Sequence, residues 1–277
     1  MAQGAIFRLL ILLTVASTSF SQSIIQNRPR KQALLASDGI SGNRKIPNDL
    51  YCDSWRFTVE TNDAGIWTRV PARCVGYVKE YMTGDKYSAD SEAVADDSLA
   101  YAKTVEISGD GKDAWIFDID ETLLSNVPYY MIHGFGSEIS DDVSFDNWVD
   151  MAEAPAIPAS LRLYKELEEL GFTIILLTGR TELQRKATEL NLQYAGYSNW
   201  ERLILRGNYD HDKTATIYKS ERRKQLEDEG YKIHGNSGDQ WSDLTGFAGC
   251  QTIFQTPKSN LCNCINSAGR KLKSSVT

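Results

Sequence analysis

Short apolar runs alternate with longer amphipathic segments along most of the chain after residue 113. Strands are predicted where the apolar runs lie, at residues 114–119, 172–177, 202–205, 231–235 and 250–255, and helices between them at residues 159–170, 181–196 and 218–230. Strands that are apolar throughout are typical of a parallel sheet with both faces covered. The alternation therefore predicts an α/β fold, in which a Rossmann-like parallel sheet is flanked by helices and joined by right-handed crossovers.

The carboxyl ends of these strands are the expected place for a site, because ligands of such sheets bind there. Asp118 and Asp120 follow the first strand, and their spacing of two directs both to the same side of an extended chain. Neighbouring carboxylates repel each other unless a cation or a shared proton stabilises them, and Mg²⁺ suits an all-oxygen site. Asp239 and Asp243, after the fourth strand, are a second supply of metal ligands.

Groups suited to an anion lie at the same predicted edge. Thr178, Gly179 and Arg180 follow the second strand, where a hydroxyl and free backbone N–H groups form an anion-binding corner. Lys219 is expected at a helix start, where it can place a positive charge on a bound phosphate. Each signal alone is weak, since an Asp-x-Asp at a strand end is commonly a turn or a helix cap. Their convergence on one edge favours a phosphate and metal site.

Two further carboxylates, Asp210 and Asp212, also follow a predicted strand. The sequence around them, YDHDK, is more typical of a solvated loop. We therefore leave them out of the predicted site.

The motifs resemble those of the haloacid-dehalogenase-type (HAD) phosphohydrolases, in the order DIDET (118–122), LLTGR (176–180), Lys219 and GDQWSD (238–243). More narrowly, DAWIFDIDETLLSNVPYY, FDNWVDMAEAPAIPASLRLYKEL, YKSERRKQL and HGNSGDQWSDL resemble the plant class B acid phosphatases and their vegetative storage protein relatives. The resemblance runs from about Leu50 to Leu244 and includes many positions outside the motifs.

This resemblance implies an acid phosphatase that hydrolyses phosphate monoesters through an aspartyl-phosphate. By position, Asp118 is the nucleophile and Asp120 the general acid–base. Mg²⁺ is expected on Asp118, the backbone carbonyl of Asp120, and Asp239, with Asp243 close by or bound through water. The groups expected to hold the substrate phosphate are Thr122, Thr178, Gly179 and Lys219.

Two alternatives remain open from the sequence. The first is a storage protein with little or no catalysis; storage relatives are thought to lose activity when the first Asp is replaced, and this chain keeps Asp118. The second is a different hydrolase or mutase of the same superfamily. The physiological substrate, the pH optimum and the oligomeric state, including a homodimer, are not determined by the sequence.

The N-terminus has the layout of a secretory signal peptide over residues 1–21. Arg8 precedes an apolar stretch, which is far shorter than the roughly 20 residues that a membrane-spanning helix needs. We therefore expect cleavage near Ser19 to Gln22 and a secreted or vacuolar protein with no membrane segment after cleavage. The net charge of −7 argues against nucleic-acid binding but not against a small phosphate ester.

The rest of the chain is expected to divide into four parts. Residues 22–50 are polar and predict a flexible arm. Residues 51–108 predict a helical region, with an extended stretch at CDSWRFTVET before amphipathic helices between Val70 and Glu106. Residues 109–256 predict the HAD-like core, with a small cap inserted at about 125–157, and residues 257–277 form a tail that differs from the ending expected for the family.

The cysteines and the cap aromatics complete the predictions. Of the cysteines at 52, 74, 250, 262 and 264, Cys52 and Cys74 are expected to form a disulfide in an oxidising compartment. The cap aromatics allow two interpretations: they pack the cap, or they flank the pocket and favour aromatic or nucleoside leaving groups. These aromatics are Tyr129, Tyr130, Phe145 and Trp148.

Overall fold

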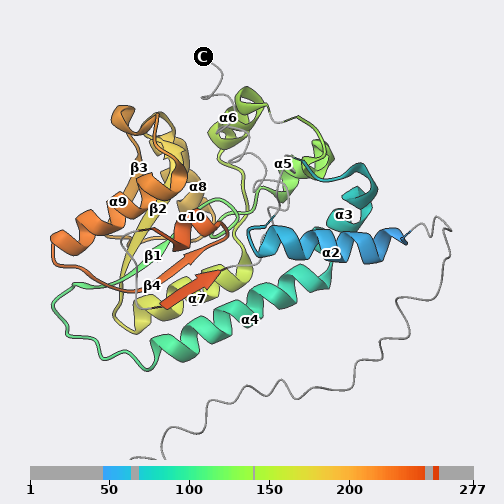
Figure 1. Cartoon of the computed structure of the whole chain (residues 1–277). Coiled ribbons are helices and arrows are strands. Elements are labelled where there is room, and N and C mark those ends of the chain that lie inside the picture. Colours follow the sequence, from blue (N-terminus) through green and yellow to red (C-terminus); the bar gives the residue numbers. More distant parts are fainter. Residues whose placement is uncertain (1–45, 64–68, 140, 247–251, 256–277) are drawn as a thin grey trace, which may run out of the picture. The chain divides into compact units, whose positions relative to one another are not determined.

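The computed structural model describes residues 46–63, 69–139, 141–246 and the strand at 252–255 (Figure 1). The chain divides into two units, Met1–Lys45 and Ile46–Thr277. The predicted signal peptide, most of the predicted arm and the tail at 257–277 lie outside the described residues. Within the described part, no helix combines the length and the apolar character that crossing a membrane requires.

A parallel sheet of five strands lies at the centre of the second unit, in the order β3-β2-β1-β4-β5. The strands are β1 (Asp113–Phe117), β2 (Thr173–Thr181), β3 (Arg202–Arg206), β4 (Lys232–Gly238) and β5 (Thr252–Gln255). The predicted α/β fold is confirmed. The prediction ended two strands too early: β2 was predicted to end at residue 177 and runs through the Thr-Gly-Arg triplet, and β4 was predicted to end at residue 235 and runs through Gly238.

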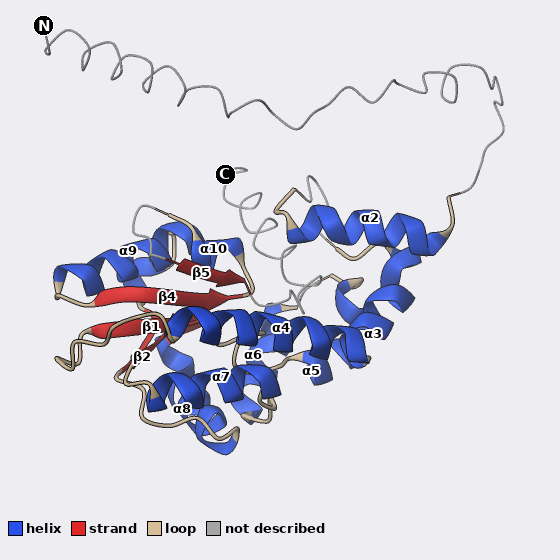
Figure 2. Ribbon diagram, turned by 90° about the horizontal axis from the view of Figure 1, so that it is seen from below, coloured by secondary structure: helices blue, strands red, loops and turns tan. Residues whose placement is uncertain are grey.

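Helices cover both faces of the sheet, as Figure 2 shows. One face carries α4 (Asp85–Ala102), α7 (Pro158–Glu169) and α8 (Arg185–Tyr194); the other carries α9 (Ala215–Asp228) and the short α10 (Trp241–Leu244). Alternate residues of β1 serve the two faces: Trp115 and Phe117 belong to the core under α7, whereas Ile116 packs with α9. The central strand is therefore buried on both sides, which is why it is apolar throughout.

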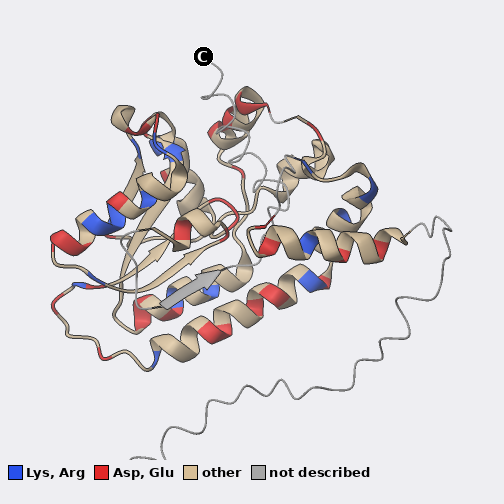
Figure 3. Ribbon diagram, in the orientation of Figure 1, with Lys and Arg blue, Asp and Glu red and all other residues tan. Residues whose placement is uncertain are grey.

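Many of the charged residues lie on the helices (Figure 3). Acidic residues line α4, and Arg162 of α7 reaches two of them, with Nη2 at 2.6 Å from Glu92 and 2.7 Å from Asp96. These exposed ion pairs join the two helices above their shared apolar contact. Exposed pairs of this kind contribute about 1 kcal/mol or less each, so the apolar contact contributes more to this packing.

The order of the strands decides where the site lies. From β1 the chain builds β2 and β3 on one side, and then returns to add β4 on the other side of β1. The carboxyl ends of β1 and β4 are adjacent, with Phe117 in register with Ser237 and the Asp118 N–H donating to the Ser237 carbonyl at 3.0 Å. This reversal of strand order is the point at which α/β sheets bind ligands.

The N-terminal region is helical from its first described residues. The stretch predicted to be extended is helix α2 (Asn48–Glu60), because Cys52, Trp55 and Val59, three and four residues apart, form one buried face. The predicted arm therefore ends before residue 48. Helix α3 (Val75–Thr83) follows a 3₁₀ turn (Ala72–Cys74), and the predicted Cys52–Cys74 disulfide joins α2 to that turn.

The segment between β1 and α7, in which a cap insert was predicted at about 125–157, is short and mainly helical. It contains α5 (Val127–Ile132), a 3₁₀ turn (Gly134–Gly136) and α6 (Asp142–Met151). Its two ends are joined by a bridge between Leu124 and Ala156 and by the Ser125 N–H, which donates to the Pro155 carbonyl at 2.8 Å.

The aromatic residues of the cap pack against one another. The Tyr129 ring stacks on His133 at 4.2 Å and meets Phe145 edge-on at 5.2 Å, and Tyr129, Tyr130 and Trp148 are all buried. These contacts support the packing interpretation. They give no support to the alternative in which the aromatics flank the pocket.

Asp210 was predicted to lie in a solvated loop, and the structure shows that it is buried. Asp210 ends a 3₁₀ turn (Asn208–Asp210) and is only 1% exposed. Its carboxylate accepts from Lys213 at 3.0 Å, Arg222 at 2.7 Å and the Gly207 N–H at 3.1 Å. Asp212 is exposed, as expected. The carboxylate of Asp210 thus joins the end of β3 to α9, the helix that carries Lys219.

Replacing Asp210 with Asn is expected to make stability less dependent on pH. Burial alone would raise the pKa of Asp210, but hydrogen bonds from Lys213 and Arg222 lower it to about 2. A lowered pKa stabilises the folded protein above about pH 4, and this contribution is lost as the pH falls towards 2. Urea unfolding should show Asp210→Asn less stable by about 2 kcal/mol at pH 7 and nearer to wild type at pH 3. An equal difference at both pH values would contradict this role.

Candidate active site

Asp118 lies at the carboxyl end of β1 and is 6% exposed. The Nζ of Lys219 donates to its Oδ1 at 2.7 Å and also to Oδ1 of Asp243. The prediction placed Lys219 at a helix start; the structure places it one turn inside α9, which begins at Ala215 after the capping residue Thr214. From this position the ammonium group reaches Asp118 and Asp243, and Lys219 is only 5% exposed.

Three carboxylates meet beside this lysine. One oxygen each of Asp118, Asp239 and Asp243 lies within 4.8 Å of the others, and all three residues are buried. Burial raises the pKa of Asp118 well above its usual value, and the carboxylates of Asp243 and Asp239 raise it further, against the opposing effect of Lys219. Three carboxylates and one ammonium would leave excess negative charge in a buried group. This oxygen-rich, desolvated set fits a hard divalent cation.

The turn after β4 holds two members of the acidic group. Asp239 follows the last strand residue, and Asp243 lies on α10, where its Oδ2 accepts from the Gln240 N–H at 2.9 Å. Gly238 allows the backbone to lie close to Asp243. A Cβ at position 238 would lie 2.3 Å from the Cβ and 2.6 Å from the Oδ2 of Asp243. Only glycine lets the end of the strand lie against the Asp243 side chain.

The side chain of Asp120 lies apart from the acidic group and is held by Arg180. The guanidinium Nη2 donates to Oδ1 at 2.7 Å and Nε to Oδ2 at 3.0 Å, and the Arg180 side chain is 2% exposed. Burial alone would raise the pKa of Asp120, but the Arg180 charge and its hydrogen bonds lower it. Asp120 was expected to bind the metal through its backbone carbonyl. Arg180 contacts only the side-chain oxygens of Asp120 in the hydrogen bonds described, so it does not occupy that carbonyl.

The predicted phosphate-binding residues lie at the same edge in differing surroundings. Thr178 is fully buried, and its hydroxyl accepts from the Arg180 N–H at 3.1 Å, while Gly179 is exposed. Thr122 is also fully buried, and its hydroxyl has no hydrogen-bond partner among the described residues. The backbone of Gly179 is thus open to a ligand, and the Thr178 hydroxyl holds the Arg180 N–H within β2, where the register with β3 shifts between Leu177 and Thr181.

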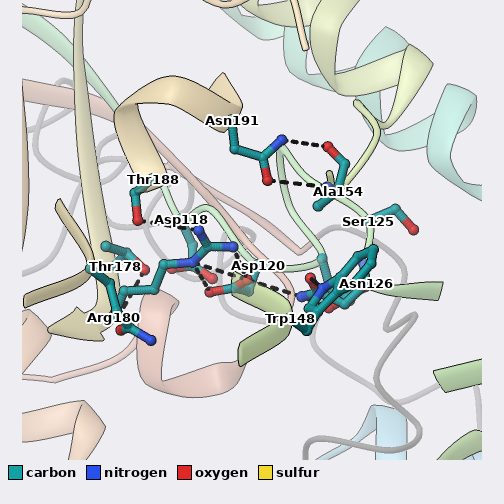
Figure 4. A network of polar contacts seen from close by, with 12 residues as sticks. Asp118, Asp120, Ser125, Asn126, Trp148, Ala154, Thr178, Arg180, Thr188 and Asn191 are labelled. Carbon is teal, nitrogen blue, oxygen red and sulfur yellow. Dashed lines mark hydrogen bonds and ion pairs between the residues drawn. The ribbon is translucent and has the colours of Figure 1, made fainter. Parts of the chain in front are cut away.

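Sequence reasoning missed the residues that surround Asp120. Asn126 is fully buried and donates to Asp120 and Glu121, and the indole N–H of Trp148 donates to Asn126 (Figure 4). Burial together with the Asp120 charge raises the pKa of Glu121 to about 8. Arg180 lies in the Thr-Gly-Arg triplet that the sequence had already marked as part of the site. Asn126 and Trp148 lie in no motif that would have marked them.

The chain is similar to a known protein family. Residues 39–261 match the family described as HAD superfamily, subfamily IIIB (Acid phosphatase). The chain belongs to this acid phosphatase family. The resemblance inferred from the motifs is therefore confirmed, and with it the assignment of the protein as an acid phosphatase.

Relatives of this acid phosphatase include both enzymes and storage proteins. It is 48% identical to acid phosphatase 1 of Solanum lycopersicum over 259 residues, which are 91% of this chain and 96% of that protein. It is 37% identical to vegetative storage protein 1 of Arabidopsis thaliana over 248 residues, or 85% of this chain and 90% of that one. The match to the tomato phosphatase has the higher identity and covers more of both chains, which favours the enzyme over the storage alternative.

A solved structure shares the fold. The class C acid phosphatase of Bacillus anthracis, solved with tungstate bound, superposes with a TM-score of 0.53 and 22% identity. The match covers 74% of this chain and 97% of the bacterial one. At this level of identity the likeness concerns the fold.

Proposed function

We propose that this acid phosphatase hydrolyses small phosphate monoesters through an aspartyl-phosphate on Asp118. A carboxylate oxygen of Asp118 attacks phosphorus as the ester P–O bond breaks, and Asp120 gives its proton to the departing oxygen, which leaves as the alcohol. Water then attacks the phosphorus of the acyl phosphate, and Asp120 takes a proton from it. The Asp118 oxygen leaves as a carboxylate, and inorganic phosphate is released.

The remaining residues of the site bind and orient in this proposal. Lys219, buried and already paired with Asp118, supplies positive charge to the transferring phosphoryl group. The exposed Gly179 backbone and the hydroxyl groups of Thr178 and Thr122 are the proposed donors to the phosphate oxygens. The hydroxyl of Thr122 supports this, because it has no partner in the described part of the chain and buried hydroxyl groups seldom lack one.

Mg²⁺ is the cation that we propose for the acidic group, held by Asp118, Asp239 and the backbone carbonyl of Asp120, with Asp243 close by or joined through water. When bound, it supplies charge that lets the Asp118 carboxylate approach an anionic phosphate. The clustering of Asp118, Asp239, Asp243 and Lys219 in one buried group carries the proposal, since residues up to 125 positions apart meet there.

Removal of the metal is expected to abolish turnover reversibly. EDTA should lower phosphatase activity by about 100-fold or more, because three carboxylates would otherwise repel the substrate. Added Mg²⁺ should restore it, and Ca²⁺, which prefers a larger and more flexible site, should restore less. The measurement is initial rate with an aryl phosphate after chelation and dialysis. Full activity in EDTA would exclude a metal requirement.

The storage alternative is addressed by the same assay. The chain resembles vegetative storage proteins as well as the tomato phosphatase, so purified protein must show turnover above an Asp118→Asn control. Absence of that excess would favour the storage role. Formation of a phosphorylated acceptor alcohol instead of inorganic phosphate would indicate a mutase or transferase of the superfamily.

The proposal includes entry into the secretory pathway after removal of residues 1–21, with an extracellular or vacuolar destination. The Cys52–Cys74 disulfide supports it, because such bonds persist in oxidising compartments. N-terminal sequencing of the protein made in a eukaryotic host tests it: an intact Met1 would contradict cleavage.

A further inference from the structure

The Asp120 carboxylate is held from two opposite directions. On one side, Arg180 donates to both oxygens, at 2.7 Å to Oδ1 and 3.0 Å to Oδ2. On the other side, the Asn126 side-chain N–H donates to Oδ1 at 2.9 Å. Among the described contacts, Oδ1 therefore accepts from two residues and Oδ2 only from Arg180. Oδ2 is the oxygen with a lone pair left to carry a proton.

The orientation of Asn126 is determined by Trp148. An indole N–H can only donate, so the Asn126 atom at 2.8 Å from Trp148 Nε1 must be the amide oxygen. The amide nitrogen then faces Asp120 and Glu121, at 2.9 Å and 2.7 Å. A reversed amide would place its oxygen against two carboxyl groups, and Trp148 prevents that reversal.

Arg180 has a corresponding support on the side of the sheet. Its Nη1 donates to the hydroxyl of Thr188 at 3.2 Å, and Thr188, on α8, is fully buried. The cap is joined to the same helix, since Asn191 of α8 makes two hydrogen bonds with the Ala154 backbone, at 2.7 Å and 3.2 Å. Figure 4 shows Arg180 and Asn126 meeting at Asp120, and Asn191 joined to Ala154 beside them.

We propose that Trp148 and Thr188 are positioning residues for the proton transfer, acting through Asn126 and Arg180 on the carboxylate of Asp120. This inference rests on the proposed function, in which Asp120 protonates the leaving group. The two supports keep the carboxylate in one rotamer and keep Oδ2 available for the proton. Through Trp148 and Asn126, helix α6 of the cap thus positions the carboxylate of Asp120 for the proton transfer.

The leaving group distinguishes positioning from simple packing. Nitrophenolate leaves as a stable anion and needs little protonation, whereas an alkoxide must receive a proton as the P–O bond breaks. The value of kcat/KM covers all steps up to that cleavage. A misplaced Asp120 should therefore lower kcat/KM much more for an alkyl phosphate than for 4-nitrophenyl phosphate, while a packing defect lowers both equally.

The test compares Trp148→Phe, Thr188→Val and Trp55→Phe across a series of aryl and alkyl phosphates. Trp148→Phe keeps an aromatic ring and removes the N–H donor. We expect kcat/KM of both site variants to fall about tenfold more on the alkyl phosphate than on 4-nitrophenyl phosphate. This is smaller than the roughly 100-fold or larger effect of removing a general acid, because Asp120 itself is still present. Trp55→Phe is the matched control, because Trp55 is as buried but its N–H has no partner among the described residues.

An unchanged ratio of alkyl to nitrophenyl kcat/KM in a folded Trp148→Phe or Thr188→Val protein would overturn the proposal. So would the same change of ratio in Trp55→Phe. Circular dichroism and thermal melting establish folding, and Thr188→Val acts on the same carboxylate if Trp148→Phe does not fold. Failure of the proposed function looks different: Asp118→Asn would then keep its turnover, whatever the ratio in the other variants.

Discussion

Replacing Asp118 with Asn is expected to lower kcat by at least about 1000-fold, because removal of a covalent nucleophile leaves only binding and electrostatic effects. The folded protein should keep or gain stability. The change removes one of three carboxylates that crowd the site, and Lys219 retains Asp243 as a partner. Loss of activity with an unchanged or higher melting temperature separates a chemical role from a structural one.

The measurement uses phosphate release from a panel of monoesters, together with thermal melting of both proteins. Asp212→Asn is a suitable control, because it makes the same change in charge at an exposed position outside the site. The control should retain wild-type rates. Residual activity of more than a few per cent in Asp118→Asn would exclude Asp118 as the nucleophile.

Two glycines of β4 give the second large effect. A Cβ at Gly238 would meet the Asp243 side chain at 2.3 Å, and a Cβ at Gly235 would meet the buried Trp115 ring at 2.5 Å. Overpacking of this kind costs about 2 kcal/mol or more, so both Gly→Ala variants should be less stable in urea. Only Gly238→Ala displaces a carboxylate of the proposed metal site. It should therefore also weaken Mg²⁺ binding by about tenfold or more.

Calorimetric titration of Mg²⁺ into the two variants separates these effects. Gly235→Ala serves as the control that is matched in strand, substitution and steric cost. It should bind Mg²⁺ with wild-type affinity if it remains folded. Equal affinity in Gly238→Ala and wild type would show that the Asp243 side chain does not need its present position for metal binding.

Much of the fold follows from local sequence pattern. Apart from the carboxyl ends of β2 and β4, the strands and the helices between them were predicted close to their observed bounds, because continuous apolar runs and helical spacing are local properties. The helix Pro158–Glu169 illustrates this, since Pro158 marks its start and Leu163 and Leu167 form its buried face. The mistaken extended stretch at residues 52–61 has a physical reason. Its aromatic and β-branched residues suit a strand, but burial of Cys52, Trp55 and Val59 on one face selects a helix.

The site divides in the same way. The Asp and Thr residues that were predicted lie at the ends of strands or close to them, so topology brings them to one edge, and Lys219 reaches them from one turn inside α9. The partners of Asp120 come from elsewhere: Trp148 from the cap and Thr188 from α8. The burial of Asp210 was missed for a similar reason, because Arg222 lies 12 positions away on another element.

The sequence by itself therefore determined the α/β class, the family and the carboxylates that approach one edge of the sheet. Those properties depend on neighbours along the chain and on the rule that parallel strands end together. Only the tertiary structure decided that Arg180 faces Asp120, that Trp148 orients Asn126, and that Gly238 makes room for Asp243. Each of these depends on how side chains from distant elements pack together. Hydrogen-bond direction and atomic contact select one arrangement there, and no local sequence pattern records them.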